Sequence, residues 1–105
     1  MVHEIVWTQE AQKNLKEIAE YISKDSEFYA EKTVNLIYQS CLKLKDFPEI
    51  GMPLPVKSDF LLRRILVKSY RVVYCFHKEI IYIIAVYKQA RPLPDNFNSF
   101  KDYFG

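Results

Sequence analysis

The chain has 105 residues, of which 50% are hydrophobic and 15% aromatic, so it fits one compact domain with a core and is not an intrinsically disordered chain. Its two glycines leave no phosphate-cradling loop, and its cysteines and histidines show no metal-ligand spacing, so neither a cofactor nor a metal is expected. Residues 1–50 hold six lysines against nine carboxylates, a net charge of −3, whereas residues 51–105 hold nine Lys or Arg against four carboxylates, a net charge of +5.

The chain is predicted to begin with a strand that leads into an amphipathic helix. Residues 2–7 are few, β-branched and aromatic, which is typical of a strand. Thr8 is a favourable N-cap, and Glu10 suits the first turn of the helix that follows. Apolar residues then recur at helical spacing and predict a helix over residues 8–23: Ala11, Leu15, Ile18, Ala19 and Ile22.

A second helix follows almost at once. Either Asp25 or Ser26 can cap it, and Pro48 should end it after about Asp46. Its apolar stripe consists of Ala30, Val34, Ile37, Cys41 and Leu44. We expect Val34, Ile37 and Cys41 to face a sheet. Because so few residues separate the two helices, they should form an antiparallel hairpin.

Three strands are predicted in the second half of the chain, over residues 60–67, 70–76 and 80–87. A proline-rich loop over residues 47–57 precedes them. The breaks Lys68-Ser69 and Lys78-Glu79 are short and favour antiparallel hairpins, although neither has the Asn-Gly chemistry of a primed turn. Residues 92–105 form a C-terminal tail, and the spacing of Phe97, Phe100 and Phe104 allows a short helix there.

The order β-α-α-β-β-β predicts an α+β fold: an N-terminal strand, an antiparallel helical hairpin and a three-stranded antiparallel meander. Residues 1–105 are taken as one domain, with the helix pair on one face of the sheet and the other face partly open. The two cysteines lie in apolar patterns and are predicted as buried free thiols, with a disulfide as the open alternative. Without a signal-peptide pattern or a bilayer-length apolar run, a soluble cytoplasmic protein with no membrane association is expected.

The candidate functional residues are basic and aromatic residues of the predicted sheet. If both breaks are two-residue turns, Leu66 opposes Arg71 and Val86 also opposes Arg71. Arg64, Arg71 and Lys88 would then share one face, although a one-residue error would scatter them. For Arg71 the competing interpretation is a salt bridge to the acidic helices, and for the tyrosines it is packing with the hydroxyl at the rim of the sheet.

Such a basic cluster allows two kinds of function. Guanidinium and ammonium groups could stabilise the charge that develops on a scissile phosphate and cleave RNA without a metal. A Tyr or Lys would then need a lowered pKa to act as the base. The same cluster could instead grip a nucleic-acid backbone or an acidic protein without any chemistry. His3 and His77 have no recognisable nucleophile and acid around them in the sequence, so acyl transfer has no support.

Four segments carry a specific resemblance. Residues 64–74 read Arg-Ile-Leu-Val-Lys-Ser-Tyr-Arg-Val-Val-Tyr, and residues 83–91 read Ile-Ile-Ala-Val-Tyr-Lys-Gln-Ala-Arg. Upstream, Trp7-Thr8 leads into the first helix, and residues 47–51 read Phe-Pro-Glu-Ile-Gly. In this order the segments resemble the RelE/ParE toxin superfamily of bacterial type II toxin–antitoxin systems, over about residues 2–94.

The resemblance implies a plasmid-stabilisation type of toxin that a cognate antitoxin neutralises, and it allows a toxin–antitoxin hetero-oligomer. Members of the superfamily have one of two targets. RelE-like members cleave messenger RNA in the ribosome, and ParE-like members poison DNA gyrase. Arg71 matches the sheet arginine of the RNases. The second catalytic arginine or histidine has no clear counterpart, since Tyr87, Lys88 and Gln89 stand there, and Tyr103 is a distant match for the catalytic tyrosine.

These departures and the long helical hairpin favour the ParE-like branch, so the resemblance implies a gyrase poison rather than an enzyme. The expected target-binding residues are Arg71, Tyr87, Lys88 and Arg91. The alternative is a metal-independent mRNA endoribonuclease, bound to the ribosome, with Arg71, Arg64, Lys68 and Lys88 as its catalytic residues. A non-toxic homologue that only binds its antitoxin is a further alternative.

Overall fold

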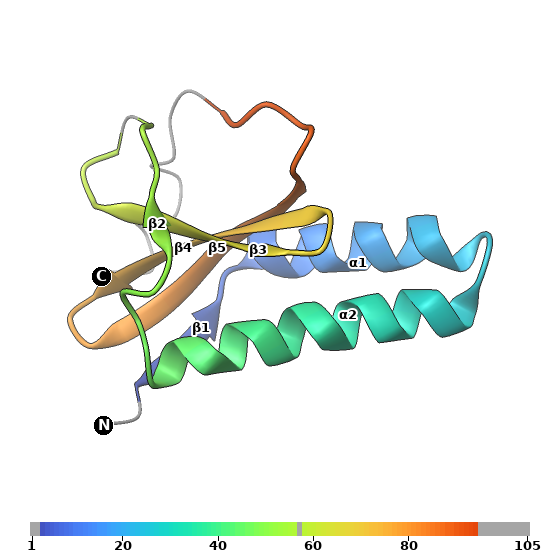
Figure 1. Ribbon diagram of the computed structural model, residues 1–105, viewed down its shortest axis with the longest axis horizontal. Coiled ribbons are helices and arrows are strands. Elements are labelled where there is room, and N and C mark those ends of the chain that lie inside the picture. Colours follow the sequence, from blue (N-terminus) through green and yellow to red (C-terminus); the bar gives the residue numbers. More distant parts are fainter. Residues whose placement is uncertain (1–2, 57, 95–105) are drawn as a thin grey trace.

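The computed structural model describes residues 3–56 and 58–94 of the chain, and within them it has the predicted α+β architecture. The elements, in chain order, are β1 (Glu4–Trp7), α1 (Gln9–Ser23), α2 (Glu27–Leu42), the 3-10 turn η1 (Lys43–Lys45), β2 (Met52–Pro53), β3 (Leu62–Val67), β4 (Tyr70–His77) and β5 (Ile80–Lys88). The helices form an antiparallel hairpin on one side of a single sheet (Figure 1). The short helix considered at Phe97–Phe104 lies outside the described residues.

The sheet has five strands in the order β1-β5-β4-β3-β2. The meander β3-β4-β5 is antiparallel as predicted, and β1 joins its far edge parallel to β5. Two details differ from the sequence prediction. The proline-rich loop contributes the two-residue strand β2, which pairs with β3, and helix α2 ends at Leu42, four residues before the predicted end, with a 3-10 turn in between.

Both helices begin where side-chain capping predicts. The Thr8 hydroxyl accepts a hydrogen bond from the Ala11 N–H at 3.2 Å, and the Ser26 hydroxyl accepts one from Tyr29 at 3.2 Å. Ser26 rather than Asp25 is therefore the cap of α2. Each bond satisfies one of the N–H groups that a helix leaves unpaired in its first turn.

An apolar cluster packs on each face of the sheet. The face beneath the helices holds the larger apolar cluster, to which Ile37, Cys41 and Leu44 of α2 contribute. The opposite face, which was predicted to be partly open, carries a second cluster that includes Leu62, Val73, Cys75, Ile84 and Tyr87, but Leu66 on the same face is 51% exposed. Partly buried apolar residues of the segments before β3 and after β5 cover this cluster: Leu54, Val56, Phe60 and Leu93.

Both hairpins of the meander have two-residue turns, as predicted. Lys78 and Glu79 have φ values of 49° and 68°, the pair of left-handed residues that a type I′ turn requires, and Lys68 has a φ of 55°. Strand twist therefore imposes primed-type geometry on residues that rarely adopt it.

The two cysteines are buried free thiols, which confirms that prediction. Burial raises the pKa of Cys41 to about 12 and that of Cys75 to about 11, so both thiols stay protonated at neutral pH. They belong to the clusters on opposite faces of the sheet. We assign them a packing role.

Candidate functional site

A β-bulge in β5 decides which candidate residues meet. Tyr74 pairs with Ile83, but Val73 pairs with Ala85, so Ile84 is an extra residue on β5. Ile84 and Ala85 consequently both belong to the cluster on the face away from the helices. Beyond the bulge the register is shifted by one residue.

The bulge corrects the predicted cluster of basic residues. Arg71 pairs with Tyr87 and not with Val86, whereas Lys88 pairs with Tyr70. Since paired residues share a face, Arg71 and Tyr87 lie away from the helices and Lys88 points toward them. The prediction that Arg71 and Lys88 share one face was wrong, because it assumed an unbroken ladder after the Lys78-Glu79 turn.

Arg64 and Lys68, the other two predicted RNase residues, do not lie together with Lys88. Arg64 opposes Val73, as predicted, and so shares the face of Arg71, but its Nη2 lies 3.6 Å from the Met52 sulfur at the β2 edge. Lys68 lies in the β3–β4 turn, and its backbone carbonyl accepts a hydrogen bond from the Gln89 side chain. Neither side chain converges with Lys88.

Arg71 is directed toward the segment after β5. Its Nη2 donates a hydrogen bond of 2.7 Å to the Arg91 carbonyl, and its buried Nε has no acceptor among the described residues. The alternative of a salt bridge from Arg71 to the acidic helices is not realised in this part of the chain. Elsewhere in the described residues, His3 Nδ1 lies 3.2 Å from a carboxylate oxygen of Glu79.

Tyr87 and Arg91 form a stacked pair at the end of β5. The Arg91 guanidinium carbon lies 4.5 Å from the centre of the Tyr87 ring, a cation–π distance. Burial raises the pKa of Tyr87, and the nearby Glu10 raises it further, while Arg91 partly offsets both effects. A raised pKa is the opposite of what a tyrosine base at neutral pH needs.

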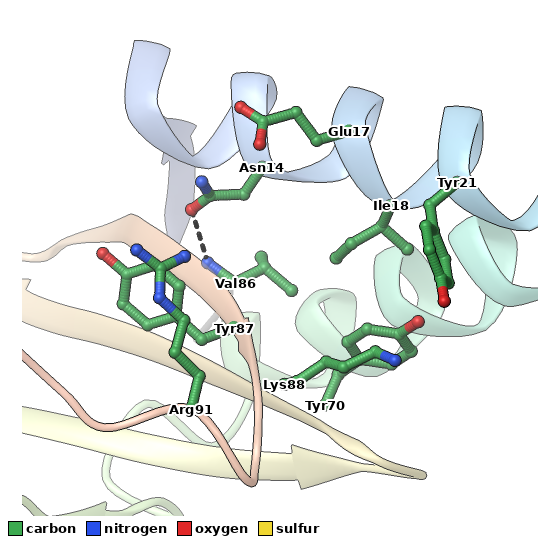
Figure 2. A pocket seen from close by; sticks show the side chains of 9 residues that line it. All are labelled: Asn14, Glu17, Ile18, Tyr21, Tyr70, Val86, Tyr87, Lys88 and Arg91. Carbon is green, nitrogen blue, oxygen red and sulfur yellow. Dashed lines mark hydrogen bonds between the residues drawn. The ribbon is translucent and has the colours of Figure 1, made fainter.

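A groove of about 410 Å³ opens between α1 and the end of β5 (Figure 2). Its apolar wall is built by Ile18, Tyr70 and Val86, and the cations Lys88 and Arg91 lie at its β5 side. The Lys88 ammonium lies 5.2 Å from the centre of the exposed Tyr21 ring. The groove is lined by Asn14, Glu17, Ile18, Tyr21, Tyr70, Val86, Tyr87, Lys88 and Arg91.

Two polar side chains fix α1 against β5 and so shape the groove. Strand β1 pairs with β5 only as far as Ile83, and no other strand of the described residues pairs with the rest of that edge. The Thr8 hydroxyl lies 2.8 Å from the Ile83 carbonyl, and the buried Asn14 accepts a hydrogen bond of 2.9 Å from the Val86 N–H. Each side chain thus forms a hydrogen bond with a backbone group of β5 that a neighbouring strand would otherwise bind.

Sequence reasoning missed Asn14 and Tyr21 as groove residues. Asn14 follows Ala11 by three positions and precedes Ile18 by four, so an amide stands within the apolar stripe of α1. That position was the available signal, because a polar group on a buried stripe requires a partner. Tyr21 gave no comparable signal, since an exposed aromatic at a helix end is common.

The fold, a helical hairpin on one face of a small sheet, is similar to that of solved toxin and toxin–antitoxin structures. The chain is similar to the chromosomal ParDE toxin–antitoxin system from P. aeruginosa, with a TM-score of 0.70, 18% identity and coverage of 83% of this chain and 96% of that chain. It is also similar to a free mutant of the E. coli toxin RelE, with a TM-score of 0.59, 16% identity and coverage of 86% of both chains. The toxin–antitoxin complex RelBE2 from Mycobacterium tuberculosis gives a TM-score of 0.56 and 17% identity, with coverage of 85% of this chain and 100% of that chain.

A family model places the chain more narrowly within this class. The model described as the ParE toxin of the type II toxin–antitoxin system parDE matches residues 5–93. The chain therefore belongs to the ParE toxin family, which confirms the superfamily and the branch that the sequence favours. A comparison with curated protein sequences finds no match. Neither described helix has the length and apolarity that a bilayer span requires.

Proposed function

We propose that this ParE-family toxin acts in the cytoplasm by binding DNA gyrase, and that it does not cleave RNA. The observation that carries the proposal is the placement of Arg71 and Lys88 on opposite faces of the sheet. Metal-free cleavage of RNA needs several cations around one phosphate, within hydrogen-bond distance of the charge that develops on it. The described basic residues do not converge in this way.

The raised pKa values of three tyrosines of the sheet support the same proposal. Tyr87 is the tyrosine nearest to Arg71 in the register, and burial raises its pKa. Burial also raises the pKa of Tyr74 and of Tyr82. A phenol with a raised pKa is a poor proton acceptor at neutral pH, so these residues suit binding better than catalysis.

We place target binding at the end of β5, where Arg71, Tyr87 and Arg91 contact one another on one side and Lys88 extends from the other. An exposed guanidinium and an exposed ammonium suit an acidic protein surface. We further take residues 1–105 as one toxin domain, with residues 92–105 as its tail.

One protein preparation in two reactions tests the target. We expect the purified chain to inhibit gyrase supercoiling or to trap cleaved DNA, and to leave messenger RNA intact in a translation reaction. Cut messenger RNA together with normal supercoiling would reject the gyrase proposal and establish the RNase alternative. If neither reaction responds, the proposal also fails, and the chain is a non-toxic antitoxin-binding homologue.

If messenger RNA is cut, Arg71→Ala identifies the catalytic role. Loss of one charge-stabilising donor should lower the cleavage rate by about 10²–10³, by analogy with the loss of one oxyanion-hole donor. Lys88→Ala is the matched control, because Lys88 faces the helices and should have a much smaller effect on cleavage. Equal losses in the two variants would contradict the placement of the site on the Arg71 face.

We also propose that a cognate antitoxin binds the chain and forms a hetero-oligomer with it. The similar structures from P. aeruginosa and M. tuberculosis are toxin–antitoxin systems, and the +5 charge of residues 51–105 suits an acidic segment. We expect the product of the adjacent gene to co-purify with this chain after co-expression at moderate salt. Recovery of the chain alone would contradict the pairing.

A further inference from the structure

Two cations at the groove beside α1 have aromatic rings as their partners. The Lys88 ammonium lies 5.2 Å from the centre of the Tyr21 ring, and the Arg91 guanidinium carbon lies 4.5 Å from the centre of the Tyr87 ring (Figure 2). Within residues 3–56 and 58–94, neither cation forms an ion pair with a carboxylate. Because a charge-assisted hydrogen bond to a carboxylate is stronger than a cation–π contact at an exposed site, this pair of cations favours an anionic ligand.

The wall of the groove beside these cations is apolar and already formed. Ile18, Tyr70 and Val86 build it, and the hydrogen bond of 2.9 Å from the Val86 N–H to Asn14 Oδ1 holds α1 against β5. A site that needs no rearrangement binds its ligand at a lower entropic cost. The volume of about 410 Å³ lies toward the lower end of the range of about 300–1,000 Å³ for small-ligand pockets, so the groove suits one or two side chains of a partner.

The other polar groups of the groove give an anionic ligand a direction. Asn14 is already engaged, since Oδ1 accepts the hydrogen bond from Val86 and Nδ2 donates one of 3.2 Å to Glu10. Glu17 extends from α1, whereas Lys88 and Arg91 lie on the β5 side (Figure 2). A carboxylate is therefore attracted toward the end of β5 and repelled from α1.

We propose that the groove binds one apolar side chain of the antitoxin together with a neighbouring carboxylate, which Lys88 and Arg91 hold. Both cations are among the residues to which we assign target binding. The bound antitoxin segment therefore competes directly with the target for them, and the antitoxin neutralises the toxin by occupying part of its target-binding surface. This inference rests on the antitoxin and target-binding roles proposed above.

A matched series of small probes tests the chemistry of the groove. The compound 4-phenylbutyrate combines an apolar ring with one carboxylate, 4-phenylbutyramide keeps the ring without the charge, and acetate keeps the charge without the ring. We expect 4-phenylbutyrate to shift the NMR methyl signals of Ile18 and Val86, with a Kd in the millimolar range, and the other two probes to bind about tenfold more weakly. Equal affinities of the acid and the amide, or unshifted groove methyls, would contradict the proposal.

Lys32→Ala is the matched control for the two groove cations. Lys32 is exposed and also lies over an aromatic ring, 5.9 Å from the centre of Phe28, but it does not line the groove. We expect Lys88→Ala and Arg91→Ala each to weaken the binding of 4-phenylbutyrate by about two- to fivefold and to leave the binding of the amide unchanged. Lys32→Ala should change neither. Equal effects of all three variants would overturn the assignment of Lys88 and Arg91 as the carboxylate ligands.

The antitoxin itself tests the competition. After co-expression with the adjacent gene, the double variant Lys88→Ala/Arg91→Ala should lose the antitoxin at a lower salt concentration than either the unaltered chain or Lys32→Ala. An equally salt-resistant complex would overturn the inference and leave the antitoxin pairing intact, and if gyrase inhibition is lost at the same time, the groove serves the target instead. If the unaltered chain retains no antitoxin, it is the proposed pairing that fails, and the inference fails with it.

Discussion

Replacement of Ile37 by alanine should lower the free energy of unfolding by about 2–5 kcal/mol, the range for a large aliphatic side chain removed from a closed core. Ile37 is fully buried in the cluster between α2 and the sheet. The neighbouring helix and the strands are fixed by their own hydrogen bonds, so the cavity cannot close by a small shift. Urea denaturation of both proteins, monitored by circular dichroism, measures the difference.

A matched surface variant on the same helix is the control. Asn35 lies two residues before Ile37 and is exposed, so Asn35→Ala should change the free energy of unfolding by no more than about 0.5 kcal/mol. Similar effects of the two variants would mean that the register of α2 against the sheet is wrong. Val34 would give a weaker test, because it is only half-buried although it lies on the predicted stripe.

The fold was largely predictable because periodicity and capping are local properties of the sequence. The α1 stripe, the Thr8 cap and the two short hairpin breaks determine the helical hairpin and the meander with little reference to the rest of the chain. The parallel pairing of β1 with β5 was not predictable in this way. It joins Glu4 to Ile80 and depends on how the helical hairpin returns the chain to the sheet.

The candidate site was predictable in composition but not in geometry. Arg71, Tyr87 and Arg91 do contact one another, whereas Lys88 lies on the other face. The difference arises from one residue, Ile84, which no local signal marks as a bulge because Ile83, Ile84 and Ala85 are all apolar. An alternating polar and apolar pattern would have shown the shift, but a strand buried on both faces has no such pattern.

Asn14 illustrates how the groove depends on the edge of β5. Beyond Ile83, no strand of the described part of the chain lies beside this edge of β5, so the Val86 N–H needs another acceptor. Asn14 supplies it from α1 and thereby fixes the helix at the distance from β5 that leaves the groove open. The groove thus depends on where the pairing of β1 with β5 ends.

The largest effect on stability that we expect from a small substitution is at Gly51. An added Cβ would lie 2.6 Å from the Tyr74 hydroxyl oxygen and 2.7 Å from the backbone oxygen of Arg64. The backbone oxygen belongs to β3 and cannot yield cheaply, so Gly51→Ala should cost about 3 kcal/mol or more, at the upper end for overpacking. The glycine is required here by close approach, and it brings the Phe-Pro-Glu-Ile-Gly segment into contact with the Tyr-Arg-apolar-apolar-Tyr strand.

A double-mutant cycle with Tyr74→Phe resolves the two parts of this contact. The buried Tyr74 hydroxyl accepts a hydrogen bond of 2.8 Å from the Gly51 N–H, so its removal alone should cost about 1–3 kcal/mol. In the double variant the phenylalanine removes the nearest clashing atom. The destabilisation of the double variant should therefore be smaller than the sum of the two single-variant destabilisations, by about 0.5–3 kcal/mol. Denaturant midpoints of the four proteins give the coupling directly. Strict additivity would show that the loop bearing Gly51 moves away from Tyr74 instead of pressing against it, and that the two sequence segments are independent in the folded protein.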